Sequence, residues 1–300
     1  MRKILVTGGT VFVSKFVANY FKDSDEVYVL NRNTREQLSG VTLIEADRNH
    51  LNDALKDYQF DVIIDVCAYN GHDIENLITA LNCEVKDYIF ISSSAVYPET
   101  NIQPFCEMQK TGPNSIWGAY GTDKLDAERY LLSRIPNAYI LRPPYLYGPM
   151  QNLYREPFVF ECALNNRPFY IPKDGKMKLQ FFHVEDLCKV IEKILETHPS
   201  EHIYNVGNED LVDINSFVSL CYKSAGKPLS TVHIYEHENQ RDYFSFYDYE
   251  YALDVTRQKT LLEKTKTLEE GLRESFDWYV KHPEDVARKD YIRFIDEHFL

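Results

Sequence analysis

Ile4-Leu-Val-Thr-Gly-Gly-Thr-Val-Phe-Val-Ser14 joins a short apolar run to a pair of glycines and then to the first turn of a helical pattern. We predict a strand over residues 4–7 and a helix over residues 12–21, with the glycines in the turn between them. In such a unit, backbone N–H groups at the start of the helix can bind the pyrophosphate of a dinucleotide. An ordinary glycine-rich turn is the other interpretation. The residues expected to contact the cofactor here are Gly8, Thr10, Val11, Phe12 and Val13.

Short β-rich runs alternate with helical patterns through the first half of the chain. This alternation is typical of a parallel sheet that helices cover on both faces. We therefore predict the α/β class, with a Rossmann-type, doubly wound parallel sheet. Further strands are expected at residues 27–30, 43–46, 62–66, 88–92 and 138–141, and helices at residues 73–81 and 120–132.

The pattern changes at Arg142-Pro-Pro-Tyr-Leu-Tyr-Gly-Pro149, a segment rich in breakers that should lead the chain off the sheet. We expect a dinucleotide-binding domain of residues 1–148 plus about 178–206. A smaller C-terminal α/β lobe of residues about 149–177 and 207–300 would be interleaved with it and bind the substrate. In this part of the chain, strands are expected at residues 180–184 and 203–206 and helices at residues 185–197, 214–224 and 268–280, with a Tyr-rich connection at 243–251.

The composition limits the class of protein. A net formal charge of −13 argues against a nucleic-acid partner, since phosphates need clustered Lys and Arg. The six cysteines form no Cys-x-x-Cys pair, and no metal site is predicted. No apolar stretch approaches the ~20 residues that span a bilayer, and the N-terminus enters a strand without a signal-peptide profile. We expect a cytoplasmic protein with a small-molecule substrate and no membrane partner. The cysteines are Cys67, Cys83, Cys106, Cys162, Cys188 and Cys221.

A tyrosine and a lysine stand four residues apart in Tyr120-Gly-Thr-Asp-Lys124. On a helix, this spacing puts both side chains on one face. An ammonium group near a phenol favours the phenolate, so Tyr120 is a candidate proton shuttle near neutral pH. The alternative is a surface pair that shares a helix face by chance.

The second expected strand ends at Asn31-Arg32-Asn33, where an acidic residue would indicate NAD. Arg32 could instead pair with a 2′-phosphate through its planar fork of donors, so NADP is preferred to NAD. A solvated loop arginine is the other interpretation. Asp47, at the end of the third strand, either accepts from the adenine amino group or caps a following helix.

Further motifs occur in a fixed order along the chain. With the turn at Gly8 and the Tyr–Lys pair, the chain resembles the extended short-chain dehydrogenase/reductase superfamily, and within it the NAD-dependent epimerase/dehydratase family. The resemblance covers nearly the whole length. The additional motifs are Ser92-Ser-Ser-Ala-Val-Tyr97, Leu141-Arg-Pro-Pro-Tyr-Leu-Tyr-Gly148, Phe182-His-Val-Glu-Asp186 and Tyr204-Asn-Val-Gly207.

The resemblance implies a catalytic set of Ser93, Tyr120 and Lys124. Ser92 and Ser94 are either alternatives to Ser93 or strand-end hydroxyls without a catalytic role. It also implies that Lys124 binds the nicotinamide ribose and that the backbone near Pro144 and Tyr145 holds the nicotinamide amide. A homodimer is expected on the same ground. The nicotinamide would supply the redox chemistry.

Several positions depart from the family pattern. Val11 and Ser14 stand where the family turn has glycine, as in a divergent branch with a Gly-Gly-Thr-x-Phe turn that includes chloroplast stem-loop-binding proteins. Ser94-Ala95 replaces the Asp-Glu pair of the sugar-nucleotide dehydratases, which disfavours elimination of water. Leu179 stands where nucleotide-sugar enzymes tend to carry a diphosphate-binding Arg. Arg241 could contact an anionic substrate, or it could equally be a surface loop arginine, and Ser94 is the other candidate for a substrate contact.

We therefore predict an NAD(P)-dependent oxidoreductase or epimerase. It would act by reversible hydride transfer at a hydroxyl or carbonyl carbon of a small substrate, sugar derivatives included. The alternative is a non-catalytic protein of the same fold that binds NAD(P) as a regulator or associates with RNA.

Overall fold

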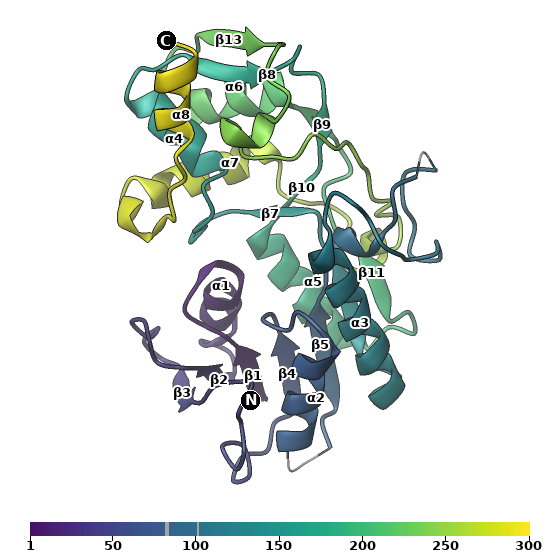
Figure 1. Ribbon diagram of the computed structural model, residues 1–300. Coiled ribbons are helices and arrows are strands. Elements are labelled where there is room, and N and C mark those ends of the chain that lie inside the picture. Colours follow the sequence, from purple (N-terminus) through teal and green to yellow (C-terminus); the bar gives the residue numbers. More distant parts are fainter. Residues whose placement is uncertain (82–83, 101) are drawn as a thin grey trace. The chain divides into compact units, whose positions relative to one another are not determined.

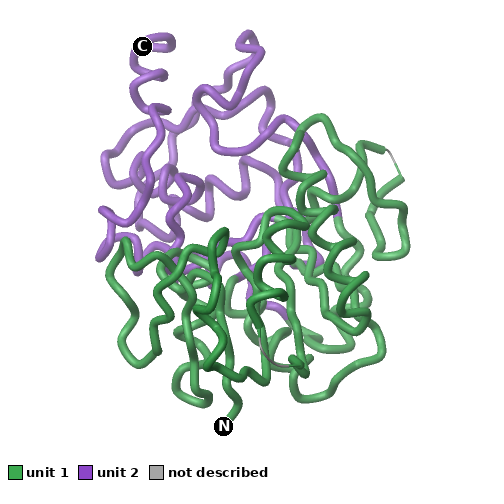
Figure 2. Tube along the Cα trace, turned by 60° about the horizontal axis from the view of Figure 1, so that its bottom comes forward, with its two compact units in different colours: residues 1–144, 184–207, 253–264 green, residues 145–183, 208–252, 265–300 purple. Residues whose placement is uncertain are grey.

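The computed structural model describes residues 1–81, 84–100 and 102–300 (Figure 1). The chain forms two compact units, shown in separate colours in Figure 2. Unit 1 comprises residues 1–144, 184–207 and 253–264, and unit 2 comprises residues 145–183, 208–252 and 265–300. These units differ from the expected domains chiefly in residues 253–264, a C-terminal segment that belongs to unit 1.

A seven-stranded sheet forms the centre of unit 1. Its order is β11-β6-β5-β4-β1-β2-β3, and every pair is parallel. This is the order of a doubly wound Rossmann-type sheet, so the predicted fold class is confirmed. The strands are β1 (Lys3–Thr7), β2 (Glu26–Asn31), β3 (Thr42–Glu45), β4 (Val62–Asp65), β5 (Asp87–Ile91), β6 (Tyr139–Arg142) and β11 (Ile203–Asn205).

Among the residues that the structure describes, four α-helices cover the sheet in pairs (Figure 1). Helix α1 (Phe12–Phe21) packs against α5 (Val184–Thr197), and α2 (Gly71–Ala80) packs against α3 (Ala119–Arg134). Each pair buries the apolar face of its helices, as the helical periodicity predicts. In the described part of unit 1, the 3-10 helices are η1 (Ser94–Val96) and η3 (Gln258–Thr260).

The sheet has its switch point between β1 and β4. Neighbouring strands on either side of it lead their connections in opposite directions, which opens a crevice at the carboxyl ends of the strands. The turns after β1, β2, β3 and β4 all lie at that edge because the strands are parallel. The fold therefore brings Gly8, Arg32, Asp47 and Cys67 to one place in unit 1.

Unit 2 is built from four α-helices and three small two-stranded sheets among its described residues. The strand pairs are β10–β7 and β13–β8, both parallel, and β12–β9, antiparallel. The helices are α4 (Glu156–Leu164), α6 (Ile214–Ser224), α7 (Leu268–Tyr279) and α8 (Tyr291–His298), and η2 (Gln240–Asp242) and η4 (Pro283–Asp285) are 3-10 helices. The strands are β7 (Tyr145–Tyr147), β8 (Phe169–Pro172), β9 (Lys178–Leu179), β10 (Phe181–His183), β12 (Val212–Asp213) and β13 (Thr231–Ile234).

Helix α4 was not predicted from the sequence. Glu156, Pro157, Phe158, Val159, Phe160, Cys162 and Ala163 are all buried. A helix that is enclosed on most of its circumference lacks the polar face that reveals a helical period, so the missing prediction has a physical cause.

The Tyr-rich connection at residues 243–251 contains no strand or helix, as expected. Tyr243, Phe244, Phe246 and Tyr251 are buried, so most of this run packs inside unit 2. Five cysteines are free thiols, and Cys83 lies outside the described residues. Among the described residues, every helix is too short or too polar to cross a membrane.

Candidate functional site

The turn after β1 requires glycine at two successive positions. Gly8 and Gly9 have φ of +94° and +90°, a region that side chains other than glycine rarely adopt. A Cβ atom on Gly9 would lie 2.4 Å from Cγ1 of Val29, and one on Gly8 would lie 2.7 Å from Oγ of Ser14. The missing side chain of Gly8 thus leaves room for Ser14, one of the two residues of this turn that depart from the family pattern.

The start of helix α1 is suited to an anion. Its N-cap residue, Val11, makes no side-chain hydrogen bond to the first turn, and that turn holds no acidic residue. Instead, the hydroxyl of Ser14 donates to the carbonyl oxygen of Val11 at 2.9 Å. The N–H groups of the first turn and the positive end of the helix dipole are therefore left for a ligand, as in dinucleotide-binding proteins.

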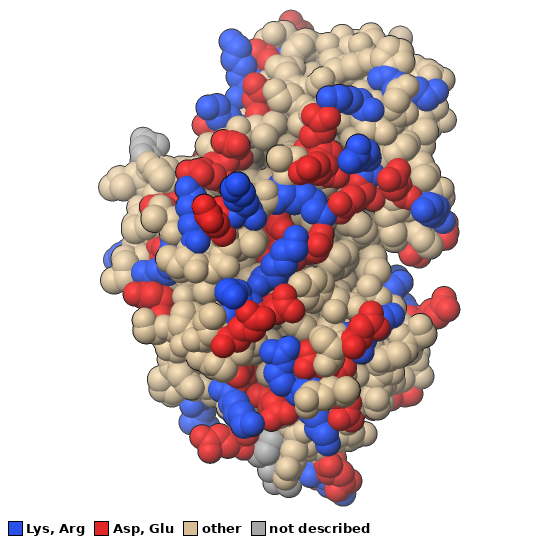
Figure 3. Space-filling view, turned by 180° about the vertical axis from the view of Figure 1, so that it is seen from behind, with Lys and Arg blue, Asp and Glu red and all other residues tan. Residues whose placement is uncertain are grey.

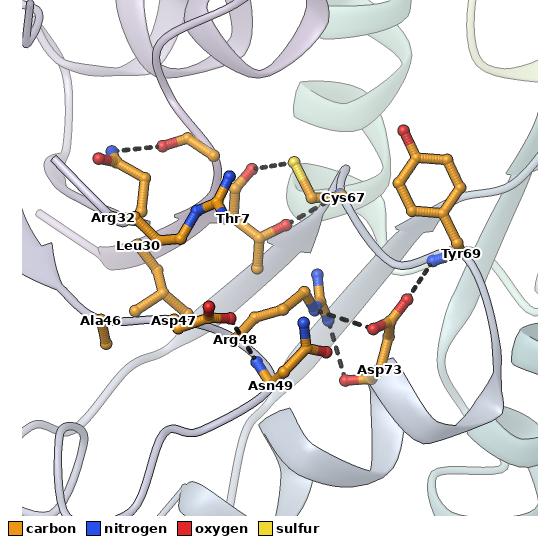
Figure 4. A pocket seen from close by; sticks show the side chains of 12 residues that line it. Thr7, Leu30, Arg32, Ala46, Asp47, Arg48, Asn49, Cys67, Tyr69 and Asp73 are labelled. Atoms are coloured by element: carbon orange, nitrogen blue, oxygen red, sulfur yellow. Dashed lines mark hydrogen bonds and ion pairs between the residues drawn. The ribbon is translucent and has the colours of Figure 1, made fainter. Parts of the chain in front are cut away.

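A cavity of about 320 Å³ lies at the carboxyl ends of β1, β2, β3 and β4 (Figure 4). Its close glycine backbone, its adjacent helix start and its polar rim fit a dinucleotide. Thr10, Phe12 and Val13 follow the glycine turn at this edge. The residues that line the cavity are Thr7, Gly8, Leu30, Asn31, Arg32, Ala46, Asp47, Arg48, Asn49, Cys67, Tyr69 and Asp73.

The predicted ribose and adenine residues both line this cavity. Asn31 donates to the carbonyl oxygen of Gly8 at 2.8 Å and so holds the end of β2 against the turn. Arg32 is exposed at the rim. Asp47 accepts from the backbone N–H of Asn49 at 2.9 Å. The alternative role of Asp47 as a helix cap is wrong, because residues 47–58 form turns rather than a helix.

Lys124 is buried at the carboxyl end of β5, with only 4% of its surface exposed. Its Nζ donates to the carbonyl oxygens of Ala68 and Ile91 at 2.8 and 2.9 Å. The rings of Tyr69 and Phe90 lie 5.5 and 4.8 Å from the ammonium group. Burial lowers the pKa of Lys124 to about 8, so its proton is held less firmly than that of a surface lysine.

Tyr120 lies on the first turn of α3 and is 42% exposed. Its ring centroid is 6.4 Å from that of Tyr69. Ser93 follows β5 and is half-buried, and its Oγ accepts from the N–H of Ala95 at 3.1 Å. The fold thus brings Ser93 and the Tyr–Lys helix to the end of the same strand.

The two alternative serines are less accessible than Ser93. Ser92 is 3% exposed, and its hydroxyl donates to the carboxylate of Glu128 at 2.5 Å. Ser94 is 5% exposed, and its N–H donates to the carbonyl oxygen of Pro143 at 2.9 Å. These contacts favour structural roles for Ser92 and Ser94.

Gly121 has a role that the sequence reasoning missed. A Cβ atom on Gly121 would lie 2.4 Å from the carbonyl oxygen of Ala95, so only glycine lets the first turn of α3 approach η1 this closely. Because Gly121 follows Tyr120, this contact sets how far Tyr120 lies from η1 and its N-cap residue, Ser93. The available signal was the glycine inside the Tyr–Lys stretch.

A buried carboxylate that contacts two cavity-lining residues, Thr7 and Arg48, was also missed. Asp65 ends β4, and its side chain is completely buried. It accepts hydrogen bonds from Thr7 Oγ1 at 2.7 Å, from Tyr88 at 2.8 Å and from the guanidinium of Arg48 at 3.0 Å. Burial raises the pKa of Asp65, but the Arg48 charge and these hydrogen bonds outweigh burial and lower the pKa to about 2. An acidic residue at the end of the apolar run 62–66 was the available signal.

Unit 2 gathers two arginines among its tyrosines. The Cζ of Arg155 lies 4.9 Å from the ring centroid of Tyr145, and the Cζ of Arg241 lies 4.6 Å from that of Tyr247. Burial raises the pKa of Tyr145 and of Tyr291, and the charges of both arginines oppose this rise without cancelling it. Within the described part of the chain, neither guanidinium forms an ion pair with a carboxylate.

Pro144 and Tyr145 were expected to hold the nicotinamide amide, and this stays a prediction. Pro144 is half-buried and is the last residue of the first segment of unit 1. Tyr145 begins β7 in unit 2, where its N–H donates to the carbonyl oxygen of Gln180 at 3.3 Å.

Comparison with known proteins agrees with this fold. The model of the NAD dependent epimerase/dehydratase family matches residues 4–207. The chain is 28% identical over 309 residues to the chloroplast stem-loop binding protein of 41 kDa b from Arabidopsis thaliana, covering 92% of this chain and 79% of that protein. It is 25% identical over 240 residues to a trifunctional UDP-glucose 4,6-dehydratase/UDP-4-keto-6-deoxy-D-glucose 3,5-epimerase/UDP-4-keto-L-rhamnose-reductase of the same plant, covering 76% of this chain and 32% of that protein.

A solved structure has the same fold. The UDP-glucuronic acid 4-epimerase from Bacillus cereus, in complex with NAD, matches with a TM-score of 0.75 at 22% identity, covering 93% of this chain and 99% of that one. The sheet and its glycine turn define the class of Rossmann-type, dinucleotide-binding α/β enzymes. The chain belongs to the NAD-dependent epimerase/dehydratase family, within the short-chain dehydrogenase/reductase superfamily.

Proposed function

We propose that this protein is an NAD(P)-dependent epimerase or oxidoreductase that acts on a hydroxyl or carbonyl carbon of a sugar nucleotide. The observation that carries the proposal is the burial of Lys124 at the end of β5, on the helix that also carries Tyr120. A lysine whose ammonium is buried and held by two carbonyl oxygens has a fixed position. Such a group can stabilise a nearby phenolate.

Each residue of the catalytic set has a distinct task in this proposal. Ser93 donates a hydrogen bond to the reacting oxygen of the substrate, and Tyr120 takes or returns the proton on that oxygen. Lys124 favours the phenolate form of Tyr120 and binds the nicotinamide ribose. When bound, the NAD(P) cofactor would supply the acceptor and donor of the hydride for the substrate carbon. Gly8, Asn31, Arg32 and Asp47 would hold the rest of the cofactor.

The substrate class is proposed from Arg155 and Arg241. Two guanidinium groups without a carboxylate partner among the described residues form a suitable site for a phosphate or diphosphate. The 25% identical trifunctional relative and the solved structure from Bacillus cereus are both named for UDP-sugars. These points support a sugar nucleotide. Ser94 and Ala95, which occupy the places of the dehydratase acid pair, speak against elimination of water.

The first experiment mixes the protein, loaded with NADP or with NAD, with UDP-glucose, UDP-glucuronic acid or UDP-N-acetylglucosamine and records the transient absorbance of reduced nicotinamide. In the Tyr120→Phe variant, the rate of nicotinamide reduction should fall about 10²- to 10⁴-fold, while the cofactor affinity should stay the same. Equal rates in wild type and variant would refute the proposed role of Tyr120.

The anion site is tested by calorimetric titration with UDP. Arg155→Met and Arg241→Met should each weaken binding, whereas Arg288→Met should not, because Arg288 is already paired with Glu161 at 2.8 Å. Unchanged UDP affinity in both test variants would refute this assignment.

We propose NADP as the preferred cofactor on the ground of Arg32, whereas the solved relative contains NAD. Calorimetric titration with NAD and NADP compares the two directly. Arg32→Ala should reduce the affinity for NADP and leave that for NAD unchanged, and the exposed neighbour Arg35 provides the matched control Arg35→Ala. Tighter binding of NAD by the wild type would reverse the assignment.

RNA association is the second candidate, motivated by the name of the 28% identical chloroplast relative. The net charge of −13 counts against it. On the face drawn in Figure 3, basic and acidic side chains are interspersed rather than separated. Fluorescence anisotropy with a stem-loop RNA at two salt concentrations tests it, since binding through phosphates weakens steeply with salt.

A further inference from the structure

The loop between β4 and α2, residues 66–70, holds the ammonium group of Lys124. The carbonyl oxygen of Ala68 accepts from Lys124 Nζ at 2.8 Å, and the N–H of Ala68 donates to Asp65 Oδ1 at 3.1 Å. The position of the lysine head group therefore depends on where Asp65 holds the backbone of Ala68.

Arg48 binds both ends of this loop. Its Nη1 and Nη2 donate to Oδ1 and Oδ2 of Asp65, each at 3.0 Å, in a bidentate pair. Nη2 also donates to the backbone carbonyl oxygen of Asp73 at 2.9 Å (Figure 4). The Asp73 carboxylate in turn accepts from the N–H of Tyr69 at 2.7 Å. One guanidinium thus links the last residue of β4 to the first turn of α2.

The chemistry of the pair favours arginine over lysine. The side chain of Asp65 is 0% exposed and that of Arg48 is 15% exposed, so each charge needs its partner. A guanidinium offers two parallel donors to the carboxylate and a further one to the Asp73 carbonyl. An ammonium group could not make all three contacts in the same directions.

We propose that Arg48 is a positioning residue for Lys124, fixing the 66–70 loop through Asp65 and Asp73 so that the Ala68 carbonyl holds the ammonium group. This rests on the proposed function in one respect, namely the catalytic role of Lys124. Tyr69, carried by the same loop, packs against Tyr120, so the loop contacts both members of the Tyr–Lys pair. Arg48 lines the cofactor cavity, yet its task is to organise the lysine.

The surrounding charges agree with this arrangement. After burial, the groups that act on the pKa of Lys124 are Asp65, Cys67 and Glu128, which raise it, and Arg48, which lowers it. Removing Arg48 while Asp65 stays ionised should therefore raise the pKa of Lys124, and Asp65→Asn should lower it. A general loss of structure would not move the two variants in opposite directions.

The test uses the full chain labelled with ¹³C and ¹⁵N on lysine, with the Lys124 Nζ signal assigned from Lys124→Arg. In Arg48→Met, the Lys124 signal should shift and titrate at higher pH than in the wild type. Amide hydrogen exchange in residues 66–70 should become at least about tenfold faster. Arg48→Lys should restore the exchange rate in part.

The matched control is Arg2→Met. Arg2 makes a bidentate pair with Asp25 in the same unit, at 2.9 and 2.7 Å, at the amino end of the sheet. The Arg2→Met variant should leave the Lys124 signal and the hydrogen exchange of residues 66–70 unchanged. If Arg48→Met does not fold, the Lys124 signal and the exchange of residues 66–70 are measured in Asp73→Asn and Arg48→Lys instead.

A folded Arg48→Met protein with the wild-type Lys124 signal and wild-type loop exchange would overturn the proposal. These readouts need no substrate. If the wild type reacts with none of the UDP-sugars, only the proposed function is refuted. The Lys124 signal and the loop exchange would still test whether Arg48 positions Lys124.

Discussion

The hydroxyl of Ser92 donates to the carboxylate of Glu128 at 2.5 Å and ties the end of β5 to α3. Glu128 lies four residues after Lys124 and also accepts two hydrogen bonds from Arg142 on β6, at 2.9 and 2.6 Å. Arg142 continues the network to Tyr97 at 3.0 Å. The helix that carries the Tyr–Lys pair is therefore held to two strands by buried polar contacts beside the catalytic candidates.

Arg142→Met should destabilise the protein by about 3–5 kcal/mol, because it leaves Glu128 as a buried charge without its partner. Urea unfolding measures the loss. Arg293→Met, which breaks exposed pairs with Asp290 and Glu297, should cost less than about 1 kcal/mol. The double variant Arg142→Met/Glu128→Leu should recover part of the loss. Stability within about 1 kcal/mol of wild type in the single variant would contradict the network's importance.

Gly121→Ala should weaken both stability and turnover, since the new Cβ would lie 2.4 Å from the carbonyl oxygen of Ala95 and push α3 away from η1. An overpacked contact of this kind costs about 1–3 kcal/mol. Gly112→Ala is the control, because its Cβ would meet Pro98 at an ordinary 3.8 Å. Thermal unfolding together with the UDP-sugar assay separates the two effects, and equal behaviour of both variants would argue against a special role of Gly121.

Glu156 makes stability fall as pH rises. Burial raises its pKa to about 7, above the value for the unfolded chain, so the native state holds a proton that the unfolded state loses first. Its contribution is complete below about pH 4.5 and is lost as pH rises to about 7, a change on the order of 3 kcal/mol. Glu156→Gln should remove this pH dependence in urea unfolding, and the exposed control Glu284→Gln should not. Parallel curves for wild type and Glu156→Gln would disprove the assignment.

Lys124 has the opposite effect on the pH dependence of stability. Its pKa is lowered to about 8, so between about pH 8 and 10.5 the unfolded chain binds a proton that the native state has released. The contribution of Lys124 to the free energy of unfolding should therefore rise with pH across that window, by on the order of 3 kcal/mol. We expect the difference in unfolding free energy between wild type and Lys124→Met to change across this range. A constant difference from pH 7 to pH 10 would show that Lys124 keeps its proton.

Local patterns in the sequence predicted many of the helices and strands. Helices α1 and α6 begin and end at the predicted residues, because each has a buried stripe at helical spacing. The predicted strands differ from β4 by one residue at its carboxyl end and from β5 by one residue at each end, the usual uncertainty of such boundaries. Helix α4 escaped prediction because its burial hides any helical period.

The candidate site was predicted less completely. Gly8, Asn31, Arg32 and Asp47 were predicted as cofactor contacts because each follows an expected strand, and they do line one cavity. Arg48, Asp65 and Gly121 were not singled out, although each sits next to a residue or run that was. Their importance follows from what they touch, and contacts between distant segments have no local signature.

The sequence by itself determined the strand–turn–helix unit at Gly8 and Gly9, the alternation of strands and helices, and the family to which the chain belongs. These depend on turn chemistry and on the spacing of apolar residues within short windows. Only the tertiary structure decided that Arg48 pairs with Asp65, that Glu128 pairs with Arg142, and that Arg155 and Arg241 lack carboxylate partners among the described residues. Charge pairing inside a protein depends on which strand ends and helix faces meet, and burial then makes each unmatched charge costly.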